Sequence, residues 1–405
     1  MLTALQSLLL DMLSTIRPVS PERFAALSAG QWSQLCRIAR QQRVESMLQH
    51  QIQSSGLEQH IPTEIEAQWA VNYRQVAIDS LSVQRLLFDL KRILDPANIP
   101  FLVLKGAWLA WNVYPHPALR PMRDIDILVR EGDALETFRL LSANGFSQTD
   151  CHNIPLEFLL KTGKHLPGLA CAHSAKKIEI HARLFTPDDK KPCPAALADF
   201  DSLYDKRQIF GLENRQIAYP SATDSLLHII VHSVEDHVFN NGPVVITDVQ
   251  HILMRGGIGW PHFWAVAGEG GWVSASRLVF DMVEYYHGEQ QIDWQGFLRG
   301  ETPVAVIEAA AAMSLQDVDA RSNFALAVDL GRESRPMAKL TRFCQRLVPA
   351  RYVLADIGNV PMNSPRIYLY YPIWFFRSVR KIYRGSPKEI SASSLVDPVI
   401  RWLAR

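Results

Sequence analysis

The sequence has few cysteines, and their spacing predicts no disulfide bond between them. Among its 405 residues no CxxC motif occurs, which argues against a disulfide framework. We therefore expect reduced thiols in a cytoplasmic protein. The five cysteines are Cys36, Cys151, Cys171, Cys193 and Cys344.

Long apolar runs are also absent. The most apolar window, IYLYYPIWFF at 367–376, is too short to span a bilayer and contains a proline. The sequence therefore predicts no transmembrane segment. The first residues, MLTALQSLLLDMLSTIRP, have no basic region and no small-residue cleavage site, so we expect no signal peptide.

Neither sign of charge dominates. The chain has 42 Lys and Arg against 41 Asp and Glu, a net charge of +1. This balance argues against a broad nucleic-acid-binding surface, and we expect no nucleic-acid partner. Apolar residues make up 48% and charged residues 20%, the composition of a folded globular protein. The length allows two or three domains, and no internal repeat is found.

Helical patterns flank a segment of different character. The pattern at 62–94 predicts a long amphipathic helix that begins with a proline, and helical patterns return from about residue 195, for example at 221–239 and 273–288. The polar stretch 329–337 reads as a linker. We predict an N-terminal helical region at 1–95, a core at 96–190, a helical domain packing on that core at 191–330 and a C-terminal helical extension at 331–405.

The segment between them alternates strands and helices. FLVLKG (101–106) is typical of a buried strand that ends at a glycine, and DIDILV (124–129) of a second strand. The stretches 106–114 and 131–146 suit helices, and 164–173 and 176–185 suit two further strands joined by a polar turn. This order predicts a compact α+β unit on one mixed sheet.

Three carboxylates in this unit suit metal chemistry. Residues i and i+2 of a strand share a face, so Asp124 and Asp126 point the same way and repel each other unless a cation lies between them. Carboxylate oxygens suit Mg²⁺. If the strand at 176–185 is adjacent, Glu179 joins them. Three carboxylates could then hold two metal ions for phosphoryl or nucleotidyl transfer.

Lys105 and Gly106 stand where a strand gives way to a helix. The free N–H groups of a helix N-terminus bind phosphate, and a neighbouring lysine adds a positive charge. Simpler interpretations remain open. DxD is common, a glycine at a strand end is often only a turn residue, Glu179 with His181 could form a solvated face, and Asp124 could pair with Arg120 or Arg123.

The order of these motifs resembles the nucleotidyltransferase superfamily that includes DNA polymerase β. More closely, it is similar to the bacterial uncharacterised nucleotidyltransferase family, mostly over residues 101–184. The matching motifs are Leu104-Lys105-Gly106, Tyr114, Arg120, DIDILV and Glu179-Ile180-His181. One departure is Ala107 after the glycine, where the superfamily has a serine. A second is a long, proline-rich gap before the first aspartate.

The resemblance implies a small mixed-sheet nucleotidyltransferase core flanked by N-terminal and C-terminal helical regions. It implies transfer of an NMP group from an NTP, ATP by default, to an acceptor on a small molecule, peptide or protein, with two Mg²⁺ ions and release of pyrophosphate. The catalytic and metal-binding residues would be Asp124, Asp126 and Glu179. The nucleotide would contact Lys105, Gly106, Ala107, Arg120 and Arg123. His165 and His181 could touch the acceptor, support the metal ligands or be structural.

Two other classes of function stay open. One is a catalytically degenerate nucleotide-binding or regulatory protein on the same fold, which the missing serine favours and the intact carboxylate trio opposes. The other is a toxin or antitoxin role.

Three further features have alternative interpretations. His228 and His232 have the i, i+4 spacing of a zinc site but no HExxH motif, so a packed helix is the simpler interpretation. Asp248 could cap a helix or contact substrate. The aromatic and basic segment 366–385 could contact a membrane surface, RNA or a neighbouring domain, and we favour the last.

Overall fold

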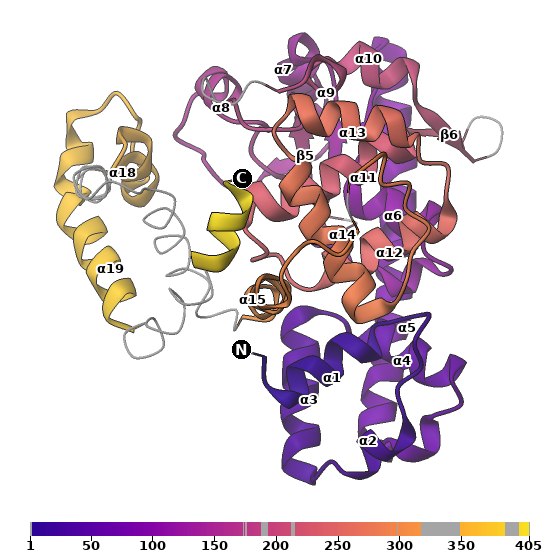
Figure 1. The fold of residues 1–405 in the computed structure, drawn as a ribbon. Helices are drawn as coiled ribbons and strands as arrows, with labels where there is room; N and C mark the ends of the chain where they lie inside the picture. Colours follow the sequence, from indigo (N-terminus) through magenta and orange to yellow (C-terminus); the bar gives the residue numbers. More distant parts are fainter. Residues whose placement is uncertain are drawn as a thin grey trace.

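The computed structural model describes most of the chain (Figure 1). It covers residues 2–172, 174, 176–187, 193–211, 215–297, 299–316, 349–384 and 397–404. The linker predicted at 329–337 and the domain boundary predicted after residue 330 lie outside these residues. The boundaries after residues 95 and 190 stay predictions.

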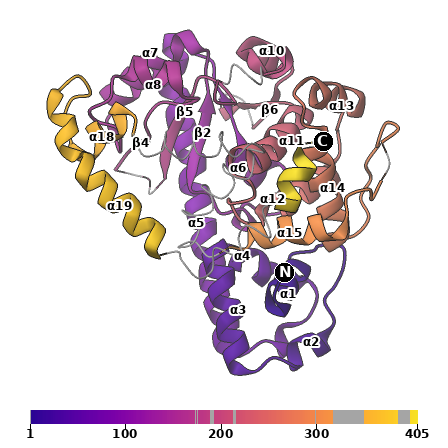
Figure 2. The same ribbon diagram turned by 60° about the vertical axis from the view of Figure 1, so that its left-hand side comes forward.

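The N-terminal region is helical, as its sequence pattern predicts. It contains α1 (Ala4–Met12), α2 (Pro21–Ala25), α3 (Ala29–Gln42), α4 (Glu45–Ser54) and α5 (Thr63–Leu94). α1 and α3 each begin at a capping box, in which a Ser or Thr side chain and a Gln side chain satisfy each other's backbone N–H groups. The long α5, predicted at 62–94, connects these helices to the sheet region (Figure 2). It buries residues at helical spacing, among them Val83, Leu87, Leu90 and Leu94.

Five short strands form one mixed sheet, which confirms the predicted α+β class. Their order across the sheet is β1 (Leu102–Val103), β2 (Asp124–Leu128), β5 (Lys177–His181), β4 (Leu169–Ala170) and β3 (Ser147–Gln148). β2 and β5 are parallel, and the other neighbours are antiparallel. All four predicted strands contribute to this sheet. The pattern did not predict β3, which pairs through only two residues and so leaves little periodic signal.

Short helices connect the strands. α6 (Lys105–Asn112) begins directly after β1, and α7 (Ala134–Ala143) follows β2 within the segment predicted as a helix at 131–146. α8 (Leu156–Thr162) was not predicted. It buries no side chain completely, so it lacks the apolar periodicity by which a helix is recognised.

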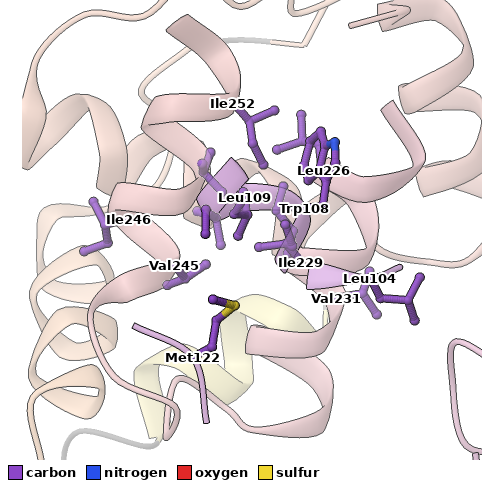
Figure 3. Close-up of a cluster of buried hydrophobic side chains, with 14 of the residues drawn as sticks. Leu104, Trp108, Leu109, Met122, Leu226, Ile229, Val231, Val245, Ile246 and Ile252 are labelled. Carbon is purple, nitrogen blue, oxygen red and sulfur yellow. The ribbon is translucent and has the colours of Figure 1, made fainter. Parts of the chain in front are cut away.

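The apolar face of α6 packs against two helices from later in the chain. These are α11 (Ala222–Val231) and α12 (Val244–Arg255), whose side chains meet Trp108 and Leu109 in the buried cluster of Figure 3. Trp108 and Leu109 are fully buried. This packing anchors the turn between β1 and α6, the turn that carries Lys105 and Gly106.

From residue 195 onward the described residues are mostly helical, with one strand pair among them that the sequence pattern missed. β6 (Gln208–Phe210) and β7 (Ile217–Tyr219) form an antiparallel hairpin. Gly211 follows β6 with a φ of 115°, a conformation that favours glycine. The helices are α9 (Ala195–Ala198), α10 (Phe200–Asp205), α11, a π-helical turn (His232–Asp236), α12, α13 (Trp260–Glu269), α14 (Val273–His287) and α15 (Val304–Ser314).

The C-terminal residues form a small helical unit beside this body. The unit contains α18 (Arg351–Gly358), a 3₁₀ segment (Pro365–Tyr370) and α19 (Tyr371–Arg384). It lies at one side of the main body (Figure 1), with α18 next to α8 (Figure 2). A last short helix begins at residue 397. Within the described ranges, no helix has both the length and the apolar character needed to cross a bilayer.

Candidate active site

The three predicted carboxylates meet on one face of the two central strands. The parallel register of β2 and β5 places Asp126 opposite Glu179, and Asp124 opposite Lys177. The alternate residues point to the other face and form a buried apolar layer, so the strand period itself separates the polar site from the core. That layer contains Ile125, Ile127, Ile178 and Ile180.

A histidine joins two of the carboxylates. Asp126, Glu179 and His181 each place one ligand atom within 4.8 Å of the others. Within the described part of the chain this is the one group of three or more His, Cys, Asp or Glu residues with that geometry. His181 is fully buried, and its Nε2 lies 2.9 Å from Asp126 Oδ1. Two carboxylates and an imidazole fit a divalent cation. Asp124 lies outside the group.

The two aspartates have opposite electrostatic environments. Burial acts to raise the pKa of Asp126, but the Lys105 ammonium and the hydrogen bond to His181 outweigh it and hold that pKa well below its usual range. Burial raises the pKa of Asp124, and the negative charges of Asp126 and Glu179 add to the effect. Asp126 is thus the stably ionised member of the pair. A cation bound nearby would favour the ionised form of Asp124 and so lower its raised pKa.

Lys105 reaches this pair from a strained backbone position. Its φ is 45°, the left-handed region that few residues other than glycine adopt. Its Nζ lies 3.2 Å from Asp126 Oδ2. Strained conformations of this kind cost about 1–3 kcal/mol and concentrate at functional sites. The next residue, Gly106, lies in the first turn of α6, where an added Cβ would lie 3.1 Å from Met122 Cγ.

Arg120 and Arg123, both predicted to bind nucleotide, have different surroundings. Arg120 binds Asp248 of α12 through two contacts, Nε to Oδ1 at 2.7 Å and Nη2 to Oδ2 at 2.9 Å. The Tyr114 hydroxyl donates to the same carboxylate at 2.7 Å. Arg120 therefore ties the loop before β2 to α12, and Asp248 is its buried partner. Arg123 is exposed.

A second cationic group comes from the N-terminal helices. Arg43 follows the last residue of α3 with a φ of 58°. Burial lowers the pKa of Arg43, the positive charge of Arg123 lowers it further, and the negative charge of Asp124 opposes both. Two arginines from separate regions therefore share the neighbourhood of Asp124. Sequence reasoning missed Arg43, because no local pattern connects residue 43 with residue 124.

A histidine and aspartate pair also borders the site. In the π-helical turn, His232 Nδ1 lies 3.0 Å from Asp236 Oδ2, and Lys164 Nζ lies 2.5 Å from the same oxygen. Burial lowers the pKa of His232 to about 3, and the Lys105 charge contributes to the shift. π-helical turns occur often at functional sites. The i, i+4 spacing of His232 and Asp236 was the signal that could have revealed this pair.

The remaining predicted residues lie close to the carboxylates or behind them. His165 pairs with His181 in an isolated β-bridge, and its Nε2 lies 3.8 Å from Glu179 Oε2. Ala107 is buried. His228 is buried in α11 and packs edge-on against Phe185. It does not belong to the group of candidate metal ligands.

The sheet thus carries carboxylates on two neighbouring strands, with a strand-to-helix turn beside them. The family model of the uncharacterised nucleotidyltransferases matches residues 28–288. The chain belongs to this family and is a nucleotidyltransferase, whose substrate is an NTP. No match is found among curated proteins or solved structures.

Proposed function

We propose that this nucleotidyltransferase moves an NMP group from an NTP to a hydroxyl or similar acceptor on a small molecule, peptide or protein, with Mg²⁺, and releases pyrophosphate. The observation that carries the proposal is the register that sets Asp126 opposite Glu179, with Asp124 one step away on the same face. Family membership supplies the reaction class. ATP is the default nucleotide to test.

The carboxylates and His181 would hold the cation. Asp126, Glu179 and His181 provide the nearest ligand atoms, and Asp124 provides a further carboxylate beside them. A divalent cation bound there neutralises phosphate charge and lowers the pKa of an acceptor hydroxyl. The Arg183 carbonyl lies 3.3 Å from His181 Nδ1 and can accept a hydrogen bond from it. A cation shared by Nε2 and Asp126 Oδ1 would replace the hydrogen bond that joins these two atoms in the structure, while the Nδ1 hydrogen bond would hold the ring in place.

The surrounding cations would position the triphosphate. The Lys105 ammonium already lies at the carboxylates, and the first turn of α6 presents the N–H groups of a helix N-terminus. Arg123 and Arg43 supply two more charges near Asp124. The acceptor oxygen attacks the α-phosphorus, the bond to the bridging oxygen breaks, and pyrophosphate leaves. Positioning and charge neutralisation account for most of the rate in such transfers.

One observation favours the alternative of a nucleotide-binding protein without transfer activity. Lys105 and His181 already satisfy both oxygens of Asp126, so this carboxylate is neutralised by the protein itself. Ala107 also replaces the serine of the superfamily pattern. A degenerate site would bind NTP and release no pyrophosphate.

The test is incubation with each α-labelled NTP and Mg²⁺, with pyrophosphate release and self-labelling as readouts. Asp126→Asn keeps the shape of the side chain and removes its charge. We expect it to lower transfer by more than about a hundredfold, a larger loss than supporting residues of a metal site cause. The matched control is Asp89→Asn in α5. Among the ion pairs found, Asp89 pairs only with Arg92, so this variant should keep full activity. Equal activity of Asp126→Asn and Asp89→Asn would refute the proposal.

Metal removal gives an independent check. Transfer should stop when a chelator removes divalent cations and return when Mg²⁺ is added in excess. Tight NTP binding without pyrophosphate release, at every nucleotide tested, would support the degenerate alternative instead.

A further inference from the structure

The C-terminal helical unit has a small core of its own. Leu354 and Ala355 of α18 and Ile367 of the 3₁₀ segment are buried together, and Tyr371 and Trp374 of α19 pack against them. The unit contacts the main body at two points. The side-chain amide of Asn153 donates to Asn359 Oδ1 at 2.5 Å, and the ring of Phe158 in α8 lies 6.0 Å from that of Tyr352 in α18. A core of this size covers only one side of α19.

The other side of this unit exposes an apolar stripe, defined here as Leu369 of the 3₁₀ segment and Ile373 and Phe376 of α19. Their exposed fractions are 73%, 44% and 70%. The 3₁₀ segment continues directly into α19, because Tyr371 already has helical backbone angles. The spacing i, i+4, i+7 therefore places the three residues on one side of a continuous helical stretch. Single exposed apolar residues are normal on protein surfaces, but a contiguous stripe marks an interaction site. The contact with a neighbouring domain that the sequence favours for this segment stays a prediction.

The sequence around the stripe contains basic residues and no acidic ones. Arg377 follows Phe376 directly and is exposed, as is Arg366. From residue 357 to residue 388 the sequence contains no Asp or Glu. The basic residues of this stretch are Arg366, Arg377, Arg380, Lys381, Arg384 and Lys388.

We propose that the apolar stripe binds the surface of a bilayer rich in anionic phospholipid. Aromatic and aliphatic side chains on one face, with lysines and arginines beside them, define a helix that lies in the interface of a membrane. The arginine stems can cover apolar surface while their guanidinium groups stay at the level of the lipid phosphates. Leu369 and Ile373 argue against RNA, because single-strand binding relies on aromatic rings that stack on bases.

This inference does not depend on the proposed transfer reaction. The apolar stripe and the carboxylate site lie on different elements and share no residue. Membrane binding would hold the enzyme where a membrane-bound or membrane-associated acceptor is presented.

The test is co-sedimentation of the full chain with two kinds of vesicle, one of phosphatidylcholine alone and one in which a third of the lipid is phosphatidylglycerol. We expect binding to the anionic vesicles, little binding to the neutral ones, and weaker binding at high salt. The double variant Leu369→Ser, Phe376→Ser should lower the partition coefficient at least about tenfold, because two large side chains lose their apolar burial.

A matched control uses two equally exposed side chains on another helix. Ile78 and Leu81 of α5 are 61% and 59% exposed, so Ile78→Ser, Leu81→Ser should bind vesicles as the native chain does. Equal circular dichroism of all variants checks that each remains folded. No binding to anionic vesicles, or equal binding by native chain and stripe variant, overturns the proposal. So does light scattering that shows the stripe variant converting a native dimer to a monomer, or filter binding that shows it losing affinity for single-stranded RNA.

Discussion

Asp248→Asn tests whether Arg120 is a structural anchor or a nucleotide ligand. The substitution keeps the shape of the side chain and removes its charge. In the native chain, Asp248 binds Arg120 through two contacts of 2.7 and 2.9 Å and accepts a third hydrogen bond from Tyr114 at 2.7 Å. Only 16% of the Arg120 side chain and 3% of the Asp248 side chain are exposed. The variant therefore leaves a largely buried guanidinium without a counter-charge.

The expected loss follows from that burial. Breaking a buried ion pair by removing one charge costs about 3–5 kcal/mol, because the remaining charge stays desolvated. An exposed pair contributes at most about 1 kcal/mol. Asp89→Asn, which breaks the exposed pair of Asp89 with Arg92 at 3.6 Å, provides the comparison within the same protein. We expect the two aspartate substitutions to differ by at least about 2 kcal/mol in the free energy of unfolding.

Urea unfolding of native chain and variants, followed by circular dichroism, measures this difference through the midpoint and the slope. A parallel titration with NTP measures nucleotide affinity below the unfolding range. If Asp248→Asn lowers the free energy of unfolding by less than about 1 kcal/mol, the structural role of Arg120 is refuted. Unchanged stability together with weaker nucleotide binding would instead support the nucleotide-binding role that the sequence predicts for Arg120.

Two further predictions concern buried groups away from that anchor. Burial lowers the pKa of His287 to about 3 from an ordinary 6.5, so the unfolded chain takes up a proton below pH 6.5 that the folded chain does not. This contribution to stability is complete above pH 6.5 and is lost as the pH falls toward 3, by about 2 kcal/mol between about pH 7 and about pH 5. His287→Gln should flatten that part of the curve of unfolding free energy against pH, whereas the exposed His152→Gln should leave it unchanged, and equal slopes in both would contradict the assignment. Gly106→Val should destabilise by about 1–3 kcal/mol, because the new side chain meets Met122. The same substitution should cost less in a Met122→Ala background, as measured by a double-mutant cycle, and an unchanged cost there would show that Met122 is not the obstacle.

Strong local periodicity made parts of the fold predictable. α5 and β2 were found within one residue at each end, because one has a long helical period and the other a strict strand alternation. The hairpin of β6 and β7 was missed, since strands of three residues carry little periodic signal. β3 was missed for the same reason, and α8 because it buries no side chain completely.

The candidate site divides in a similar way. The placement of Asp124 and Asp126 on one face follows from the strand period alone. The role of Glu179 depended on β5 lying next to β2, which a sequence can suggest and only strand pairing decides. His181 was recognised as a neighbour of the site, but its place among the candidate metal ligands required the measured distances.

The sequence by itself determined the alternation of strands and helices, the shared face of the two aspartates and the motifs of the nucleotidyltransferase family. Each of these depends on residues close together in the chain, where geometry follows from backbone period. Only the tertiary structure decided that Arg120 binds Asp248, 128 residues further along, and that Arg43 of the first helices lies near Asp124. Such contacts depend on how distant elements pack, because the side chain that neutralises a buried charge is selected by proximity in space and not by spacing in the sequence.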